Sequence, residues 1–361
     1  AGTARGGAGR ARAAAQEGGM EIIRAEDCSP EPIARWTLGV LGYGNQGRAQ
    51  ALNLRDSGHA VLVSARPGGP SAETASADGF QVVAPEHLPG AVDLVAVLTP
   101  DETHAELIAG LARGGRASGR LRCLVFAHSF SLRFTPPPFE PEWDVVVVAP
   151  AGPGAQLRER FVRGEGLPAL LAVERDVSGE AAPRARAYAA GIGCARAGLL
   201  PVTVAEEAEI DLFGEQAVLC GGMNALTRAA FETLVAAGYP AEAAYLECVQ
   251  QLRLTAELLE RHGPEGMRRR ISPTALWGDL TRGERLIDAG VRARLAEILG
   301  EIRSGAFARE WLAWAAADPE WIRHGLETAR SAELERCGRV VRGLFAEDGG
   351  GGGEAGAGES G

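Results

Sequence analysis

Short, continuous apolar runs alternate with helical patterns over the first half of the chain. The runs that predict strands cover residues 37–42, 60–64, 92–98, 121–127, 143–149 and 168–173. Their hydrophobicity is continuous instead of alternating, which is typical of strands covered by helices on both faces. Residues 46–57 predict the first intervening helix. The pattern therefore predicts an α/β domain of the Rossmann type, with a doubly wound parallel sheet.

After Leu200 the pattern changes to amphipathic helices with apolar residues at i, i+3 and i+4, over 204–260 and 284–345. The boundary is expected near 194–202, between a Rossmann domain at 20–200 and an all-α domain at 201–346. The two ends of the chain are of low complexity and are expected to be disordered. They comprise an extension at 1–19, with Met20 as the natural start, and a Gly-rich tail at 347–361.

Composition narrows the functional classes. The net charge of −10 argues against a nucleic-acid partner, which requires a basic face. No apolar run approaches the roughly 20 residues that span a bilayer, so no membrane partner is expected. All 37 basic residues are arginine, which excludes Schiff-base chemistry and a lysine general base.

The cysteines show neither a CxxC pair nor regular spacing, and no secretory signal is evident. This usage is typical of reduced, mostly buried thiols, so we expect a cytoplasmic protein. The six thiols are Cys28, Cys123, Cys194, Cys220, Cys248 and Cys337.

The sequence GYGNQG follows the first predicted strand and opens a helix, which is the context that a dinucleotide-binding GxGxxG motif requires. The first glycine permits a tight turn, the second allows a pyrophosphate to approach the backbone, and the third allows close packing of helix on sheet. A simple strand–helix turn is the alternative. The candidate cofactor-binding residues are Gly42, Tyr43, Gly44, Asn45, Gln46 and Gly47.

The second strand ends in VSARPGGPS, where NAD enzymes generally place an acidic residue for the ribose. Ser64, Arg66 and Ser71 stand there instead, and a guanidinium with hydroxyls suits a 2′-phosphate. The sequence therefore favours NADPH over NADH. The alternative is that Arg66 is a solvated loop residue.

Histidine and carboxylates supply the candidate chemistry. His128 follows a predicted strand on the ligand side, where an imidazole can order a water or relay a proton. Asp211 and Glu215 share one helical face, and Glu247 and Gln251 have the same spacing on another helix. Carboxylates set among apolar residues suit Mg²⁺, although such pairs are more often solvated surface.

A series of longer motifs resembles one known family. In chain order they are GYGNQGRAQALNLRDSG, FAHSF, VAPAGPG, PALLAV, YAAGIG, EIDLFGEQAVLCGG, FETLVAAGYP, YLEC, ISPTA, GDLTRG and SGAFAREW. Together they resemble the short form of the ketol-acid reductoisomerases of branched-chain amino-acid biosynthesis. The match runs from about Thr37 to Arg342, which is almost the whole chain expected to fold.

The resemblance implies an NADPH-binding Rossmann domain, a helical domain that interlocks with a second copy in a homodimer, and a pair of Mg²⁺ ions. It implies alkyl migration in a 2-hydroxy-3-keto acid, followed by reduction. By resemblance, Asp211 bridges both metals, Glu215 binds the first, and Glu247 of the partner subunit binds the second. Ser272 corresponds to a serine that holds the substrate carboxylate, and His128 to a histidine beside the metal-bound water.

Two positions depart from the family pattern. The family's Pro-Lys-Gly-Pro-Gly loop reads PAGPG here, so Ala151 replaces a lysine, and a second metal-ligating glutamate is replaced by Gln251. One change removes a positive charge and the other a negative charge. The wall near Ser272 is also altered, to Leu276 and Trp277.

Three hypotheses follow. The first is a diverged NADPH-dependent oxidoreductase of specialised metabolism, which keeps one Mg²⁺ site and reduces a keto acid or related imine without efficient alkyl migration. The second is an authentic reductoisomerase that converts 2-acetolactate to the dihydroxy acid, with Gln251 ligating through its amide oxygen. The third is a non-catalytic cofactor-binding homologue.

Overall fold

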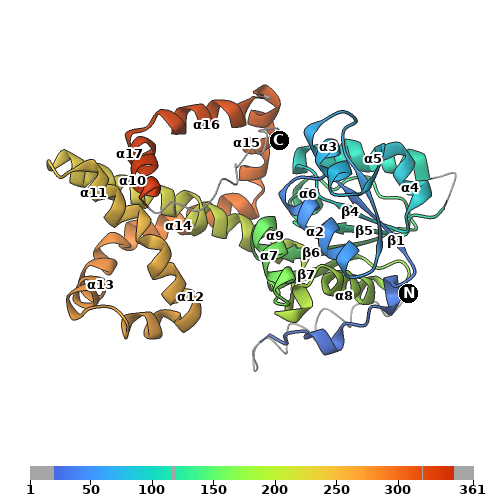
Figure 1. Ribbon diagram of the computed structural model, residues 1–361, viewed down its shortest axis with the longest axis horizontal. Helices are drawn as coiled ribbons and strands as arrows, with labels where there is room; N and C mark the ends of the chain where they lie inside the picture. The colour runs from blue at the N-terminus through green and yellow to red at the C-terminus, as the bar shows by residue number, and fades with distance from the viewer. Residues whose placement is uncertain (1–19, 116–118, 319, 345–361) are drawn as a thin grey trace. The chain divides into compact units, whose positions relative to one another are not determined.

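The computed structural model describes residues 20–115, 119–318 and 320–344 (Figure 1). The predicted disordered segment at 1–19 lies outside the described residues, and so does the predicted tail at 347–361. The chain divides into two compact units, residues 1–208 and 209–361. Within the described residues, no helix has the combination of length and apolarity that crossing a membrane requires.

The first unit is built on a sheet of eight described strands in the order β3-β2-β1-β4-β5-β6-β7-β8. The strands are β1 Thr37–Leu41, β2 Ala60–Ser64, β3 Gln81–Val83, β4 Leu94–Val97, β5 Cys123–Phe126, β6 Asp144–Pro150, β7 Ala169–Arg175 and β8 Leu199–Pro201. The helices between them are α2 Asn45–Asp56, α3 Pro70–Ala77, α4 Leu88–Ala91, α5 His104–Gly115, α6 Phe130–Phe134, α7 Gly154–Val162 and α8 Ala181–Gly191.

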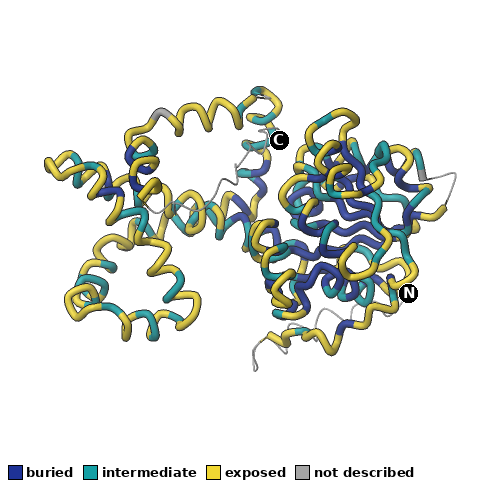
Figure 2. Tube along the Cα trace, in the orientation of Figure 1, coloured by how far each residue is buried: buried dark blue, intermediate teal, exposed yellow. Residues whose placement is uncertain are grey.

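The four consecutive valines of β6 show why the apolar runs are continuous. Val146 and Val148 belong to a core shared with α2, α3, α7 and α8, whereas Val145 and Val147 face a second core with α4, α5 and α6. Successive side chains of a strand point to opposite faces, so a sheet covered on both sides needs apolar residues at every position. These strands are the dark blue centre of this unit in Figure 2.

Two features of the sheet differ from the prediction. β7 pairs antiparallel with β6, although every other pairing within the sheet is parallel. Continuous hydrophobicity reports burial on both faces and carries no information about strand direction. The predicted doubly wound parallel sheet is therefore present, except that the strand direction of β7 is opposite to the prediction. The short strands β3 and β8 were also missed, because three residues at the two ends of the sheet give too weak a pattern.

The second unit is helical in the residues described. Its helices, beginning with the one that enters it from the first unit, are α9 Val204–Gly214, α10 Gly221–Ala236, α11 Ala241–Tyr245, α12 Leu252–Arg268, α13 Pro273–Leu286, α14 Ala289–Arg303, α15 Ala306–Ala317, α16 Trp321–Ser331 and α17 Glu333–Gly343. Two π-helical segments interrupt them, η6 Glu215–Leu219 and η7 Leu246–Gln250. The helices are therefore shorter than the runs at 204–260 and 284–345 predicted.

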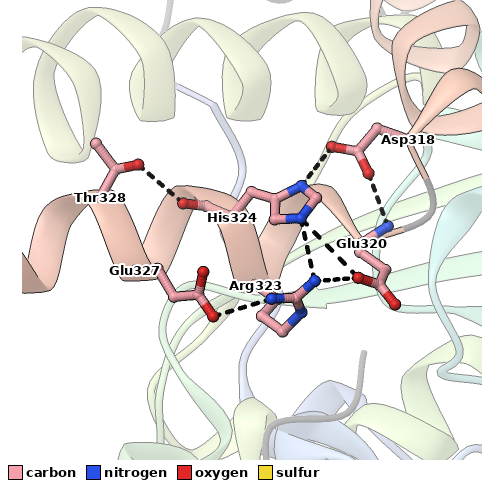
Figure 3. A network of polar contacts seen from close by, with 6 residues as sticks. All are labelled: Asp318, Glu320, Arg323, His324, Glu327 and Thr328. Atoms are coloured by element: carbon pink, nitrogen blue, oxygen red, sulfur yellow. Dashed lines mark hydrogen bonds and ion pairs between the residues drawn. The ribbon is translucent and has the colours of Figure 1, made fainter.

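A polar network surrounds the start of α16 (Figure 3). The Asp318 carboxylate lies 2.9 Å from His324 Nδ1, and Arg323 pairs with Glu327 at 3.0 Å and with Glu320. All five side chains are substantially exposed, so solvent screens these ion pairs and each contributes little to stability. We interpret the network as local support for the first turn of α16.

Candidate active site

Three glycines shape the turn between β1 and α2, each for a different physical reason. Gly42 has φ +96°, and a Cβ there would lie 2.7 Å from the Leu98 carbonyl oxygen. A Cβ on Gly47 would lie 2.0 Å from the Gly42 carbonyl oxygen, so helix and turn touch. A Cβ on Gly44 would meet no described atom within 4 Å, which leaves open space beside the backbone.

This open space fits the pyrophosphate of a dinucleotide. α2 begins at Asn45, and within the described residues no side chain caps its N-terminus. The first N–H groups of a helix have no partner inside the helix, and together with the helix dipole they favour an anion. The turn therefore has both the room and the donors that the predicted cofactor requires.

Tyr43 and Arg48 connect the glycine turn to the end of α3. The Asp78 carboxylate accepts a hydrogen bond from the Tyr43 hydroxyl at 2.9 Å and another from Arg48 Nε at 2.8 Å. The hydrogen bond from Arg48 holds the pKa of Asp78 below its usual range. Tyr43 is buried, so the structure gives this predicted cofactor-binding residue a supporting contact.

The loop after β2 presents a cation. Arg66 is exposed, and among the described residues its guanidinium has no ion-pair partner. Ser71 is half-buried in the first turn of α3, whereas Ser64 is fully buried and its hydroxyl oxygen has no hydrogen-bond partner in the part of the chain that the structure describes. Arg66 is thus the member of this predicted set best placed to meet a 2′-phosphate.

Replacing Arg66 with alanine is expected to raise the Kd of NADPH by about 10-fold or more, because a charge-assisted hydrogen bond to phosphate is lost. The Kd of NADH should change less than about twofold. Fluorescence titration measures both constants. Arg163→Ala, which removes an exposed arginine paired with Glu159, is the matched control. An equal loss of affinity for both dinucleotides would contradict the assignment of Arg66 to the 2′-phosphate.

The PAGPG loop is held against the glycine turn. Gln46 Nε2 donates to the Gly152 carbonyl oxygen at 2.9 Å, and a Cβ on Gly154 would lie 2.0 Å from the Asn45 carbonyl oxygen. The Ala151 N–H donates to the Pro168 carbonyl oxygen at 2.8 Å. Ala151 is exposed. The loop therefore brings a methyl group, and no charge, to the ligand-side end of β6.

A buried glutamate orients His128, which follows β5. Glu207 on α9 is only 1% exposed, and its carboxylate oxygens lie 3.3 Å from His128 Nδ1 and 2.7 Å from the Ser129 backbone nitrogen. A carboxylate can only accept a hydrogen bond, so Nδ1 carries the hydrogen in this contact. The other ring nitrogen, Nε2, is not used by this contact. Burying this charge is tolerable because two donors meet it.

Sequence reasoning missed Glu207. It lies four residues before Asp211, and Asp211 lies four residues before Glu215, so carboxylates recur at a spacing of four from α9 into η6. That spacing was the available signal. Its partner His128 lies 79 residues away in sequence, which no local pattern reveals.

Both segments that carry the predicted carboxylate ligands include π-helix. Glu215 opens η6, directly after the turn of α9 that bears Asp211, and Glu247 lies within η7. π-Helical turns are rare and occur frequently at functional sites, where the wider turn redirects side chains. The local backbone thus marks these two segments independently of their residue types.

The donor chemistry of Asp211 and Glu215 fits a hydrated Mg²⁺, which is commonly held by one or two carboxylates and keeps several waters. Within the described residues of this single chain, no group of three or more His, Cys, Asp or Glu side chains converges as a metal site. Glu247 is engaged differently, because Gln251 Nε2 donates to its carboxylate oxygen at 2.6 Å. An amide N–H group repels a cation, so this pair fits a second metal poorly.

Ser272 has a local structural role in the second unit. It is the N-cap of α13, and its hydroxyl oxygen accepts a hydrogen bond from the Ala275 N–H at 3.1 Å. It is exposed, and Trp277 on the same helix is 66% exposed. The contact leaves the predicted role in substrate binding untested.

The predicted site residues divide between the two units. The glycine turn, Arg66, His128 and Ala151 lie in the first unit, where the Gln46–Gly152 contact joins the turn to the PAGPG loop. The predicted residues that lie in the second unit are Asp211, Glu215, Glu247, Gln251 and Ser272.

Comparison with known sequences gives the same division. Residues 32–198 match the family described as acetohydroxy acid isomeroreductase, NADPH-binding domain, and residues 204–347 match the ketol-acid reductoisomerase C-terminal domain. A ketol-acid reductoisomerase (NADP(+)) of Xanthomonas campestris pv. campestris (strain B100) is 47% identical over 300 residues, which cover 83% of this chain and 88% of that relative. The same-named protein of Xanthomonas axonopodis pv. citri (strain 306) is 46% identical over 276 residues, covering 76% and 82%.

A solved structure agrees with the sequence matches. An NADH-preferring ketol-acid reductoisomerase from an uncultured archaean superposes with a TM-score of 0.86 at 36% identity, covering 91% of this chain and 100% of that one. The two family matches together span most of the chain, and sequence identity of 47% over 300 residues is high enough to indicate common family membership. The chain therefore belongs to the ketol-acid reductoisomerase family and contains both of its domains.

Proposed function

We propose that this protein is an NADPH-dependent oxidoreductase that reduces a 2-keto acid or related imine and has lost efficient alkyl migration. The observation that carries the proposal is the 2.6 Å hydrogen bond from Gln251 to Glu247. It occupies one oxygen of a carboxylate that the family resemblance assigns to the second metal. A role in specialised metabolism follows if the enzyme no longer performs the family's isomerisation.

Hydride delivery depends on parts of the chain that are intact. NADPH, when bound, supplies a hydride to a carbonyl or imine carbon. The glycine turn binds the pyrophosphate, and Arg66 meets the 2′-phosphate. Glu207 accepts the Nδ1 hydrogen of His128, which leaves Nε2 directed away from that carboxylate. When Nε2 is also protonated, the imidazolium donates the proton that the carbonyl oxygen or imine nitrogen takes up as the hydride reaches the carbon.

Alkyl migration makes different demands on the site. Moving a group between adjacent carbons requires electron density to be drawn from two neighbouring oxygens at once, which a pair of cations does well. With Gln251 in place of a carboxylate and Ala151 in place of a lysine, both kinds of charge around those oxygens are reduced. Asp211 and Glu215 remain, and they suffice for one hydrated Mg²⁺.

Metal counting distinguishes one site from two. The wild-type chain is expected to bind one Mn²⁺, used as a paramagnetic substitute for Mg²⁺, with micromolar or tighter affinity, and Gln251→Glu should add a second. Electron paramagnetic resonance of free Mn²⁺ gives both stoichiometries. Arg253→Ala, an exposed change two residues away, is the control. Two tight sites in the wild type would contradict the proposed loss.

The proposed assembly is a homodimer formed through the second unit. Large apolar side chains of η6 and α10 are exposed in the single chain, with Val218 at 60%, Leu219 at 62% and Leu226 at 55%. A surface of this kind indicates an association site. Sedimentation equilibrium is expected to give twice the chain mass, and Leu219→Arg should shift the equilibrium toward monomer. A wild-type monomer at micromolar concentration would exclude this assembly.

The second candidate, an authentic reductoisomerase, is favoured by the 46–47% identity to proteins of that name. Substrate screening separates the candidates. NADPH oxidation is measured with 2-acetolactate and with a panel of 2-keto acids and cyclic imines. Turnover of at least one panel compound with little turnover of 2-acetolactate supports the proposed reductase, whereas rapid turnover of 2-acetolactate supports the authentic reductoisomerase. Calorimetric NADPH binding with no turnover of any compound, 2-acetolactate included, would instead support the non-catalytic alternative.

A further inference from the structure

His104 is a buried histidine outside the predicted site. It begins α5 after the turn η4 Asp101–Thr103, and it is 3% exposed. Its Nε2 lies 2.9 Å from the Thr99 carbonyl oxygen and its Nδ1 lies 2.7 Å from the Ser131 hydroxyl oxygen. A carbonyl oxygen only accepts, so Nε2 carries the hydrogen, and Nδ1 of the neutral ring accepts from Ser131.

The two partners of His104 belong to two loops on the ligand side of the sheet. Thr99 follows β4, and its Cγ2 lies 2.9 Å from the position that a Cβ on Gly42 would occupy, so it backs directly onto the glycine turn. Ser131 lies three residues after His128 in the segment that follows β5. β4 lies between β1 and β5 in the sheet. The imidazole of His104 therefore links Thr99, which lies against the glycine turn, to the segment that follows His128.

The environment of His104 keeps both hydrogen bonds in place at neutral pH. Burial lowers the pKa of His104 to about 4, although the hydrogen bond to the Thr99 carbonyl oxygen acts in the opposite direction. The Asp101 carboxylate is farther from Nδ1, at 3.6 Å, than the Ser131 hydroxyl. Ser131 is fully buried, so losing its acceptor would leave an unsatisfied hydroxyl inside the domain.

We propose that His104 is a positioning residue that sets the placement of His128 relative to the bound dinucleotide, acting through Thr99 on one side and Ser131 on the other. The inference deepens the proposed function, because it rests on the role given there to His128. Glu207 anchors the segment after His128 at Ser129 and His104 anchors it at Ser131, so the backbone that follows His128 is held at two points.

Three variants separate the two arms of this bridge. Ser131→Ala removes only the bond to the His128 segment, and it should lower kcat about 10-fold while leaving the Kd of NADPH within about twofold. His104→Phe keeps a buried ring but removes both bonds, so it should lower kcat about 10-fold and also raise the Kd of NADPH about 5-fold. His104→Gln retains one donor and one acceptor and should restore most of both losses.

The readouts keep this inference distinct from the proposed function. NADPH affinity is measured by fluorescence without any substrate, so the Thr99 arm is tested even if no keto acid is turned over. ¹⁵N NMR of the wild type should show a protonated Nε2 and an unprotonated Nδ1 for His104. The inference is overturned if the Nδ1–H tautomer is found, or if Ser131→Ala and His104→Phe leave kcat and NADPH affinity within twofold of wild type. If His104→Phe does not fold, Ser131→Ala and His104→Gln decide the question.

Discussion

The variant with both Ala151→Lys and Gln251→Glu is expected to convert 2-acetolactate at least about 100-fold faster, in kcat/KM, than the wild type. The lysine returns a cation to the end of β6, where the PAGPG loop is already fixed by Gln46, and Ala151 is exposed, so the longer side chain has room. The glutamate places a carboxylate where the family resemblance assigns a ligand of the second metal. Ala151→Lys alone adds an unbalanced positive charge, and Gln251→Glu alone adds an unbalanced negative charge. The gain in kcat/KM of the double variant should therefore be much larger than the two single gains combined.

A control for this variant carries the same charges at neighbouring positions. Ala155→Lys is exposed on α7, and Gln250→Glu lies in η7 one residue before Gln251. The control pair should leave the rate with 2-acetolactate near the wild-type value. A wild type that already turns over 2-acetolactate rapidly, with only a modest gain in the double variant, would favour the authentic reductoisomerase instead.

Glu207→Gln is expected to lower kcat about 100-fold while the Kd of NADPH stays within about threefold of wild type. An amide oxygen can still accept the Ser129 N–H, but the NH₂ group then faces His128 Nδ1. That contact favours the opposite tautomer of the imidazole, so proton exchange through Nε2 is impaired. Steady-state kinetics and fluorescence titration give the two constants.

The neighbouring residue offers a matched control. Glu206→Gln makes the same chemical change one position earlier, where the exposed side chain accepts hydrogen bonds from Thr203 at the start of α9. It should affect kcat less than about twofold. If Glu207→Gln proved as active as Glu206→Gln, Glu207 would be a structural residue with no part in orienting His128.

Local patterns predicted the sheet domain because its strands obey a simple rule. Burial on both faces demands apolar side chains at every position, and the valines of β6 satisfy that demand. The turn between β1 and α2 could also be predicted, because each of its glycines has a local structural reason. Gly42 has a positive φ, Gly47 lies in close contact with the turn, and Gly44 leaves open space beside the backbone. The antiparallel direction of β7 could not be predicted from the sequence, because the pairing of strands is set by the tertiary fold.

The part of the candidate site that could not be predicted from the sequence depends on contacts between residues far apart in the chain. His128 could be singled out from its place after a strand, but Glu207 and Ser129, which orient it, are joined to one another across 78 residues by folding alone. The π-helical segments that contain Glu215 and Glu247 could not be predicted from the spacing of apolar and polar residues. The neutral side chain of Gln251 is evident from the sequence, whereas its hydrogen bond to Glu247 is a property of the folded chain.

The proposed loss of alkyl migration is tested most directly by comparing two isomeric substrates with the wild-type protein and Mg²⁺. One is 2-acetolactate, which must rearrange before it is reduced, and the other is the 3-hydroxy-2-keto acid that the rearrangement would produce. NADPH oxidation is followed for both at saturating cofactor. Rapid reduction of the 3-hydroxy-2-keto acid with turnover of 2-acetolactate at least about 100-fold slower is the predicted result. Comparable kcat/KM values for the two isomers would contradict it.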